Sequence, residues 1–134
     1  MTHQVLHDII RTRFKNQVQI PQAISVAFDN APFTKPDNTI WCRWTILTAE
    51  SFQASIGGGT NIDRTPGVCI AQIFGPIEAG DKNILTLADV IKGAFRRTTD
   101  TGVVFKVPSV TIVGRTENLW QVNVSCPFYA DNVA

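Results

Sequence analysis

Hydrophobic residues recur along this chain with two different spacings, and these spacings predict its helices and strands. Residues 3–18 carry an apolar side chain at every fourth position, which places those side chains on one face of a helix. The four residues are Leu6, Ile10, Phe14 and Val18. We expect the Thr2 hydroxyl to cap the first turn of this helix and Pro21 to end it.

Two runs rich in β-branched and aromatic residues, at 40–47 and 67–76, predict neighbouring strands. The two faces of the first run carry different side chains. One face has Ile40, Cys42, Trp44 and Ile46, and the other has Trp41, Arg43, Thr45 and Leu47. Because neither face is fully polar, we expect a helix to cover one face and a loop or a neighbouring chain to cover the other.

The segments beside these strands predict extended chain and turns. Residues 26–33 are too apolar for a linker and too interrupted by Asp29 and Pro32 for a long strand, so we expect a short extended segment and a turn. Residues 49–67 contain the run Gly57–Gly59, which predicts the tip of one long hairpin between the two strands.

A second helix is predicted from near Asp81 to about Arg97, because apolar residues again follow a helical spacing there. Thr86 and Asp89 together resemble a capping box, which offers a later start for the same helix. The start of this helix is therefore left open between the two positions.

Two further strands are predicted at 107–115 and 120–129, joined by a turn. The second of them alternates apolar and polar residues throughout. The predicted fold is therefore α+β. It has a mainly antiparallel sheet of about four strands with two helices packed on one face, in the order α-β-β-α-β-β, in a single domain over residues 1–134.

The composition narrows the range of partners. Of the 134 residues, 44% are hydrophobic and only 17% are charged, and the 12 basic and 11 acidic residues give a formal net charge of +1. This balance predicts a globular domain with weak sequence-independent affinity for DNA or for an anionic membrane. The first residues lack the succession of regions of a signal peptide, so we expect the protein to be made and used in the cytoplasm.

No combination of residues predicts a catalytic, cofactor or metal site. His3 and His7 lie one helical turn apart but have no evident third ligand. Cys42, Cys69 and Cys126 fall in predicted strands without a C-x-x-C pair, so we expect reduced thiols in or near the core. We therefore expect a structural protein rather than an enzyme.

Two polar features have a structural and a functional interpretation. The glycine run followed by Thr60 has no lysine after it, which favours a turn over a phosphate-binding loop. Four arginines fit solvated positions, or contacts with phosphate or with a partner's carboxylates. They are Arg64, Arg96, Arg97 and Arg115.

The succession of segments resembles the phage tail-terminator family, small proteins that complete the tail tube of tailed bacteriophages. The segments that carry the resemblance are VAFDNAPF, IWCRWTIL, a glycine-rich tip, RTPGVCIAQIFGP, LADVIKGAFR and WQVNVSCPFY. They span nearly the whole chain in the order typical of the family.

The resemblance implies a structural protein of the virion tail, assembled in the cytoplasm of the bacterial host. It implies a homo-oligomer, a hexameric ring, on the last ring of tail-tube protein. Such a ring stops tube polymerisation and presents the surface to which the head-tail connector or stopper protein attaches. DNA would contact it only in transit through the lumen, and no membrane is involved.

The resemblance also implies candidate contact residues. The strand edge that bears Trp41 and Arg43 is a candidate for contact between subunits. The hairpin tip is a candidate for contact with the tube or the lumen, through Gly57, Gly58, Gly59, Thr60, Asn61, Asp63 and Arg64.

Two alternatives are retained. One is a neck or head-tail joining protein that binds after the tail is complete. The other, from a different class, is a small-ligand-binding or hydrolytic α+β domain, which would need a pocket with converging polar groups and shifted pKa values.

Overall fold

The computed structural model describes residues 1–55 and 61–133, which form two helices and one sheet. The first helix is α1 (His3–Phe14), which continues through the π-helical turn η1 (Lys15–Gln19) into the short α2 (Ile20–Gln22), and the second is α3 (Lys82–Phe95). The strands are β1 (Ser25–Phe28), β2 (Trp41–Thr48), β3 (Phe52–Gln53), β4 (Asp63–Pro76), β5 (Thr99–Asp100), β6 (Val103–Phe105), β7 (Ser109–Thr116) and β8 (Leu119–Asp131).

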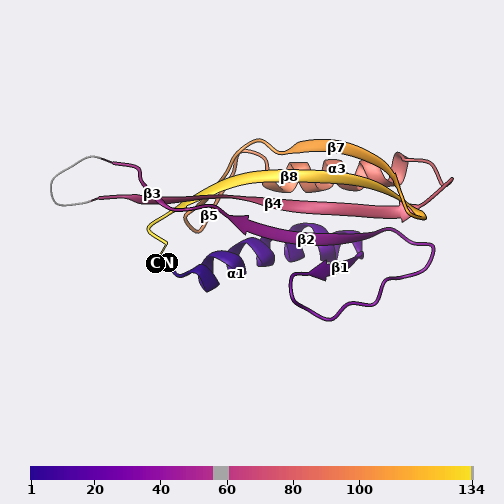
Figure 1. Ribbon diagram of the computed structural model, residues 1–134, viewed down its shortest axis with the longest axis horizontal. Coiled ribbons are helices and arrows are strands. Elements are labelled where there is room, and N and C mark those ends of the chain that lie inside the picture. The colour runs from indigo at the N-terminus through magenta and orange to yellow at the C-terminus, as the bar shows by residue number, and fades with distance from the viewer. Residues whose placement is uncertain (56–60, 134) are drawn as a thin grey trace.

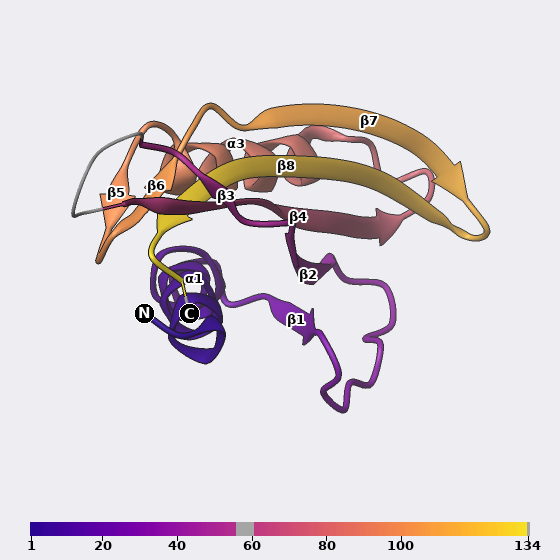
Figure 2. The ribbon, with the colours of Figure 1, turned by 60° about the vertical axis from the view of Figure 1, so that its left-hand side comes forward.

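All eight strands belong to one curled sheet (Figure 1 and Figure 2). Its main path is β1-β2-β4-β8-β6-β5, with β3 paired to β4 and β7 paired to β8. β1 and β2 are parallel, and the other pairs are antiparallel. The longest pairing joins β4 to β8 along the whole of residues 64–76, so these two strands form the spine of the sheet.

The predicted sheet of about four strands in the order α-β-β-α-β-β is wrong. The sheet has eight strands and is mixed, with one parallel pair, and the order is α-β-β-β-β-α-β-β-β-β. The strands missing from the prediction are β1, β3, β5 and β6, with two to four residues each. A strand this short has too few positions to show an alternation, and it forms because a longer neighbour offers it backbone partners.

The predicted hairpin between the two long strands is confirmed. β2 pairs with residues 67–74 of β4, and β3 extends the pairing to Asp63 and Arg64. The predicted cap is also confirmed, because the Val5 N–H donates to the Thr2 hydroxyl at 3.2 Å. The second helix takes the earlier of its two starts, at Lys82.

The prediction that Pro21 ends the first helix is wrong, since the helix continues to Gln22. Proline lacks an N–H and its ring clashes with the carbonyl four residues earlier. The chain accommodates it by widening the preceding turn, in which the Ile20 N–H donates to the carbonyl of Lys15, five residues back. The helix ends at Ala23, which adopts a left-handed conformation with φ 52°.

Both helices pack on the same face of the sheet, and an aromatic row joins them to it. Phe14 of α1 stacks on Trp44 of β2 with ring centroids 4.1 Å apart. Phe95 of α3 lies 5.3 Å from Trp44 and 5.1 Å from Phe105 of β6. The prediction that a helix covers one face of β2 is confirmed, because Cys42, Trp44 and Ile46 of the same face are all buried in this cluster.

Arg13 ties the two helices together. Its guanidinium donates twice to the carbonyl of Ala94, at 2.6 and 2.9 Å, and once to the Asp100 carboxylate at 3.4 Å. A cation at these carbonyls stabilises the carboxyl end of α3 through hydrogen bonds and through the helix dipole.

The three cysteines are free and fully buried, as predicted. Cys69 and Cys126 lie directly opposite each other in the β4–β8 pair. Burial raises the pKa of the Cys42 and Cys69 thiols, and it raises the pKa of Cys126 to about 12. The folded chain therefore holds these thiols in their neutral form.

Replacing Trp44 with Ala should lower the free energy of unfolding by about 3–5 kcal/mol, because it removes the buried indole on which Phe14 stacks. Leu47→Ala is the matched control in the same strand, since Leu47 is 52% exposed. Its effect should be within about 0.5 kcal/mol. Urea unfolding monitored by circular dichroism measures both, and equal losses would contradict the assigned faces of β2.

Native thiols should react only slowly with a thiol-specific disulfide reagent at pH 8, whereas the chain unfolded in guanidinium should react at once. Burial raises the pKa of Cys126 to about 12, while an unfolded thiol titrates near about 8.5. The contribution of the buried thiol to the free energy of unfolding is therefore fully present below the pKa of the unfolded thiol. It falls as the pH rises from there toward 12. Fast reaction of a native thiol would contradict this assignment.

Candidate functional site

The sheet face opposite the helices, here the outer face, carries a second and smaller apolar cluster. Trp41 of β2 stacks on Phe74 of β4 with ring centroids 4.5 Å apart. Phe33, from the loop after β1, lies 5.3 Å from Trp41. Ala27 and Leu119 complete the cluster. β2 thus carries apolar residues on both faces because a loop of the same chain covers part of the outer face.

Arg43 lies over this cluster. Its guanidinium carbon is 5.9 Å from the Trp41 ring centre and 5.8 Å from that of Phe74, within the range of a cation–π interaction. The side chain is exposed, and among residues 1–55 and 61–133 no carboxylate lies within ion-pair distance of it. The contact with the aromatic pair restricts the guanidinium, whose planar shape suits bidentate binding of a carboxylate.

The two predicted interface residues, Trp41 and Arg43, differ in their accessibility. Trp41 is only 5% exposed. The edge of β2 from Trp41 to Trp44 is paired with β1, and the unpaired part of that edge begins at Thr45. Arg43 is therefore the member of the pair that is accessible to another molecule.

A hollow of about 330 Å³ opens beside Arg43 and is lined largely by polar groups. On its floor, the Gln121 amide donates to Asn123 at 2.9 Å and accepts from the Thr116 hydroxyl at 3.1 Å. Gln121 is 7% exposed, and these bonds satisfy its buried amide. The hollow therefore combines two cations, Arg43 and Lys35, and the carboxylate of Glu117 with uncharged hydrogen-bonding groups.

Of the predicted hairpin contacts, Gly57, Gly58, Gly59 and Thr60 lie outside the described residues. Asn61 and Asp63 form part of the hairpin base. Asn61 accepts a hydrogen bond from Gln53 at 3.3 Å. The backbone of Asp63 exchanges bonds with Asn132, which fixes the base against the carboxyl end of β8.

Arg64 is bound within its own chain rather than solvated in a loop. It forms two hydrogen bonds with Asp131, at 2.8 and 3.2 Å, and its guanidinium carbon lies 4.1 Å from the Tyr129 ring centre. The hydrogen bond to Asp131 raises the pKa of Arg64. The geometry is that of a bidentate pair on an aromatic ring, and it braces β4 against β8 below the hairpin.

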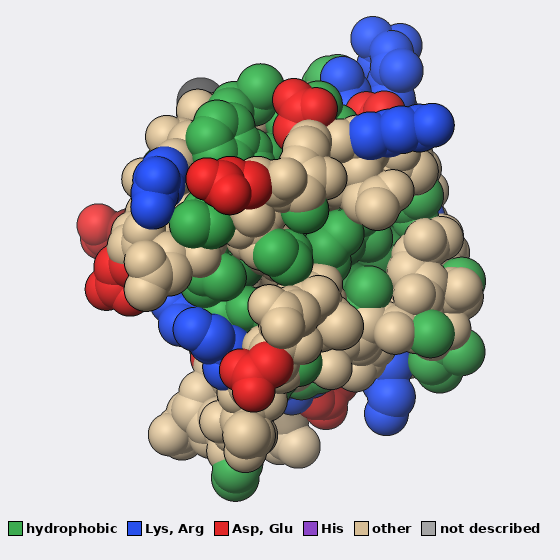
Figure 3. Space-filling view, turned by 90° about the vertical axis from the view of Figure 1, so that its right-hand side faces the viewer, with side chains coloured by type: hydrophobic (Ala, Val, Ile, Leu, Met, Phe, Trp, Pro, Cys, Tyr) green, Lys and Arg blue, Asp and Glu red, His purple; other side chains and the backbone are tan. Residues whose placement is uncertain are grey.

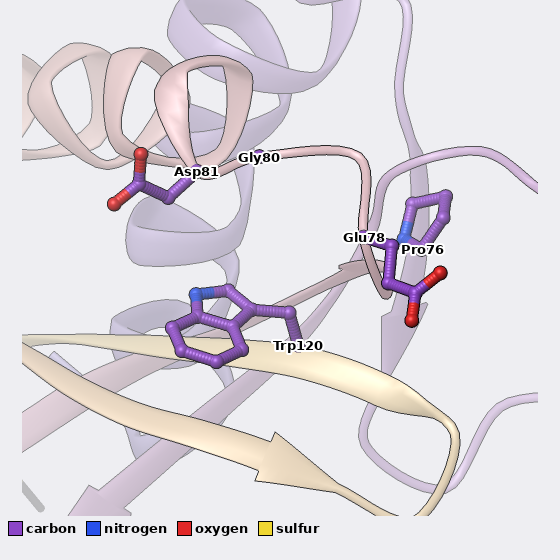
Figure 4. A pocket seen from close by; sticks show the side chains of 5 residues that line it. All are labelled: Pro76, Glu78, Gly80, Asp81 and Trp120. Atoms are coloured by element: carbon purple, nitrogen blue, oxygen red, sulfur yellow. The ribbon is translucent and has the colours of Figure 1, made fainter.

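The opposite end of β4 presents an apolar surface with hollows around Pro76. Figure 3 shows hydrophobic side chains gathered about the middle of this end, with charged side chains spaced around the border. Two adjoining hollows of about 300 and 400 Å³ share Pro76 and Gly80. In Figure 4 the Trp120 indole lies between Asp81 on one side and Pro76 with Glu78 on the other.

The sequence analysis did not predict a contact surface at this end. The available signal was Trp120, an apolar residue in phase with the core face of β8 but placed at the very start of the strand. A large apolar side chain at a strand end extends past the core and reaches the surface.

The described residues include no group of three or more His, Cys, Asp or Glu side chains able to hold a metal ion. His3 is exposed and His7 is partly exposed on α1.

Comparison with known proteins identifies the family. A family model described as phage tail terminator protein matches residues 5–128. A solved protein structure without a functional name superposes with a TM-score of 0.66 at 19% sequence identity, covering 96% of each chain, which shows a shared fold. No curated protein matches the chain. Within the described residues, no helix is long and apolar enough to cross a membrane.

Proposed function

The chain belongs to the phage tail terminator family, and we propose that it caps the tail tube as a ring, stops tube polymerisation and provides the surface for head attachment. The observation that carries this proposal is the family match over residues 5–128, which includes all elements except the first two residues of α1 and the last three of β8. In this proposal the protein acts by stoichiometric binding rather than by catalysis. It is a component of the virion tail that assembles in the host cytoplasm.

Contact between subunits is assigned to the outer face around Arg43. A closed cyclic assembly brings two different patches of neighbouring copies together. Arg43 is exposed, is held over Trp41 and Phe74, and has no carboxylate partner within the described part of its own chain. An arginine held in this way loses little conformational freedom when it binds a carboxylate of a neighbour.

The two ends of the spine suit two different partners. The hairpin lies at one end of the long axis, and the end of β4 at Pro76 lies at the other (Figure 1). We assign the hairpin, whose base is braced by Arg64 and Asp131, to the tail-tube protein. The apolar end around Pro76 is assigned to the head-tail connector or stopper protein. A net charge of +1 is compatible with DNA that slides through the lumen without tight binding.

Deleting the gene from its phage should produce tails of irregular and excessive length, because tube growth loses its stop. Negative-stain electron microscopy of lysates, with a complemented deletion as the control, measures the length distribution. Tails of normal length that remain unattached to full heads would replace capping with a joining function. Normal infectious particles would contradict both.

Arg43→Glu should fold normally yet fail to restore tail length when it is supplied to the deletion phage. The side chain is exposed, so a reversal of its charge should change the melting temperature little, while it would repel a carboxylate of a neighbour. Lys15→Glu, the same charge change on the exposed side of η1, should restore normal length. Full complementation by Arg43→Glu would contradict the assignment of Arg43 to the contact between subunits.

A further inference from the structure

One border of the sheet is formed by β7, which has a single partner. β7 pairs with β8 along Ser109–Thr116, and no other strand of the described chain pairs with it (Figure 2). The backbone groups on its other side are therefore open to a further strand.

β7 also lacks most of the features that protect a strand edge. Its sequence, SVTIVGRT, contains no proline, lysine or carboxylate. A bulge at Val113 and the charge of Arg115 near the end of the strand are its blunting features, and Val113 is 48% exposed beside Ile112, which is 56% exposed. A long edge with exposed apolar residues and little protection favours strand addition.

The opposite border of the sheet has a free stretch of its own. The carboxylate of Asp29 accepts a hydrogen bond from the Ile46 N–H at 3.2 Å, and this covers one position. From Leu47 through β3 to Gln53, the described backbone makes its pairing bonds only on the β4 side. This segment, here the β2–β3 edge, carries Leu47 and Phe52, which are 52% and 51% exposed.

The exposed apolar residues are thus divided between the two borders. Five of the seven large hydrophobic side chains that are exposed in the described residues lie on or next to them. Leu47 and Phe52 belong to the β2–β3 edge, and Val107, Ile112 and Val113 lie in or just before β7. Two different patches on opposite sides of one chain are what a heterologous, head-to-tail contact requires.

The strand directions allow the two borders to meet. β2 is antiparallel to β4, β4 to β8, and β8 to β7, so β7 runs opposite to β2. If β7 of one copy lies beside the β2–β3 edge of a second copy with the sheet continued across the junction, the new pair is antiparallel. This is the pairing of the rest of the spine.

We propose that β7 of each copy pairs with the β2–β3 edge of the next copy, so that the curled sheet continues from subunit to subunit. This inference rests on the proposed ring and adds the strands that join its members. The occupant of each edge is a second copy of this chain, because the chain itself carries both complementary borders. Arg43, two residues before the free part of β2, then lies beside the junction.

The test uses the full-length chain and three lysine substitutions at exposed apolar positions. Ile112→Lys blocks β7, and Phe52→Lys blocks the β2–β3 edge, because a charge on an edge opposes strand addition. Val5→Lys is the matched control, since Val5 is 44% exposed on α1, which belongs to neither border. Light scattering after size-exclusion chromatography gives the assembly size, and circular dichroism gives the melting temperature of each variant.

The wild-type chain and Val5→Lys should form multi-subunit assemblies, and Ile112→Lys and Phe52→Lys should each be monomers that melt within a few degrees of the wild type. An equimolar mixture of the two monomeric variants should form dimers and nothing larger. The intact β7 of the Phe52→Lys copy meets the intact β2–β3 edge of the Ile112→Lys copy, and both remaining edges are blocked. This mixture distinguishes edge pairing from a general loss of solubility or stability.

Three results would overturn the proposal. The first is assembly of either edge variant to the size of the wild type, and the second is dimers formed by Phe52→Lys alone through β7. The third is a wild-type chain that stays monomeric up to about 1 mM, a concentration at which even a weak contact of about 4 kcal/mol would be populated. These failures are separate from failure of the capping function. Tail length in the deletion phage tests capping whatever strands join the subunits.

Discussion

The stack of Phe14 on Trp44 is the contact on which the rest of the fold depends. It joins the first helix to the sheet with ring centroids 4.1 Å apart, and Phe95 and Phe105 extend the same aromatic row to the second helix and to β6. Because both helices share this row, the sheet curls around them and leaves its other face without a helix. The outer face and both free edges follow from that one-sided packing.

One-sided packing also explains the low charge of the chain. In the proposed ring the outer face meets another subunit. This face combines an aromatic cluster and a row of amide and hydroxyl groups with a few charged side chains, among them Arg43, Lys35 and Glu117. Such a face stays soluble through hydrogen bonding with water and still permits close contact. A chain with 17% charged residues is suited to contacts made by backbone and shape more than by charge.

The parts of this structure that could be predicted from sequence are those with a long periodic signal. The core face of β2, with Cys42, Trp44 and Ile46, and the burial of all three cysteines followed directly from alternation. The four shortest strands did not, because their existence depends on neighbours distant in sequence. Pro21 also led to a wrong prediction, because a π-helical turn before it allows the helix to continue through a residue that normally ends one.

The candidate site was predictable only in outline. Arg43 and Trp41 alternate with the core residues, so the sequence places them on the second face, but it does not show that Phe33 closes over Trp41. Arg64 was expected in a solvated or contact position at the hairpin tip, yet its partners Asp131 and Tyr129 lie more than 60 residues away in β8. Tertiary partners of this kind leave no local signal in the sequence.

The length of β4 has a mechanical consequence. Its 14 residues run without a break from the hairpin base to Pro76, a span of roughly 45 Å, and β8 is hydrogen-bonded along nearly all of it. Molecules bound at the two ends would be held at a separation set by this strand pair, as by a spacer of fixed length. Communication between them would then occur through position alone, without any change of shape in the spacer itself.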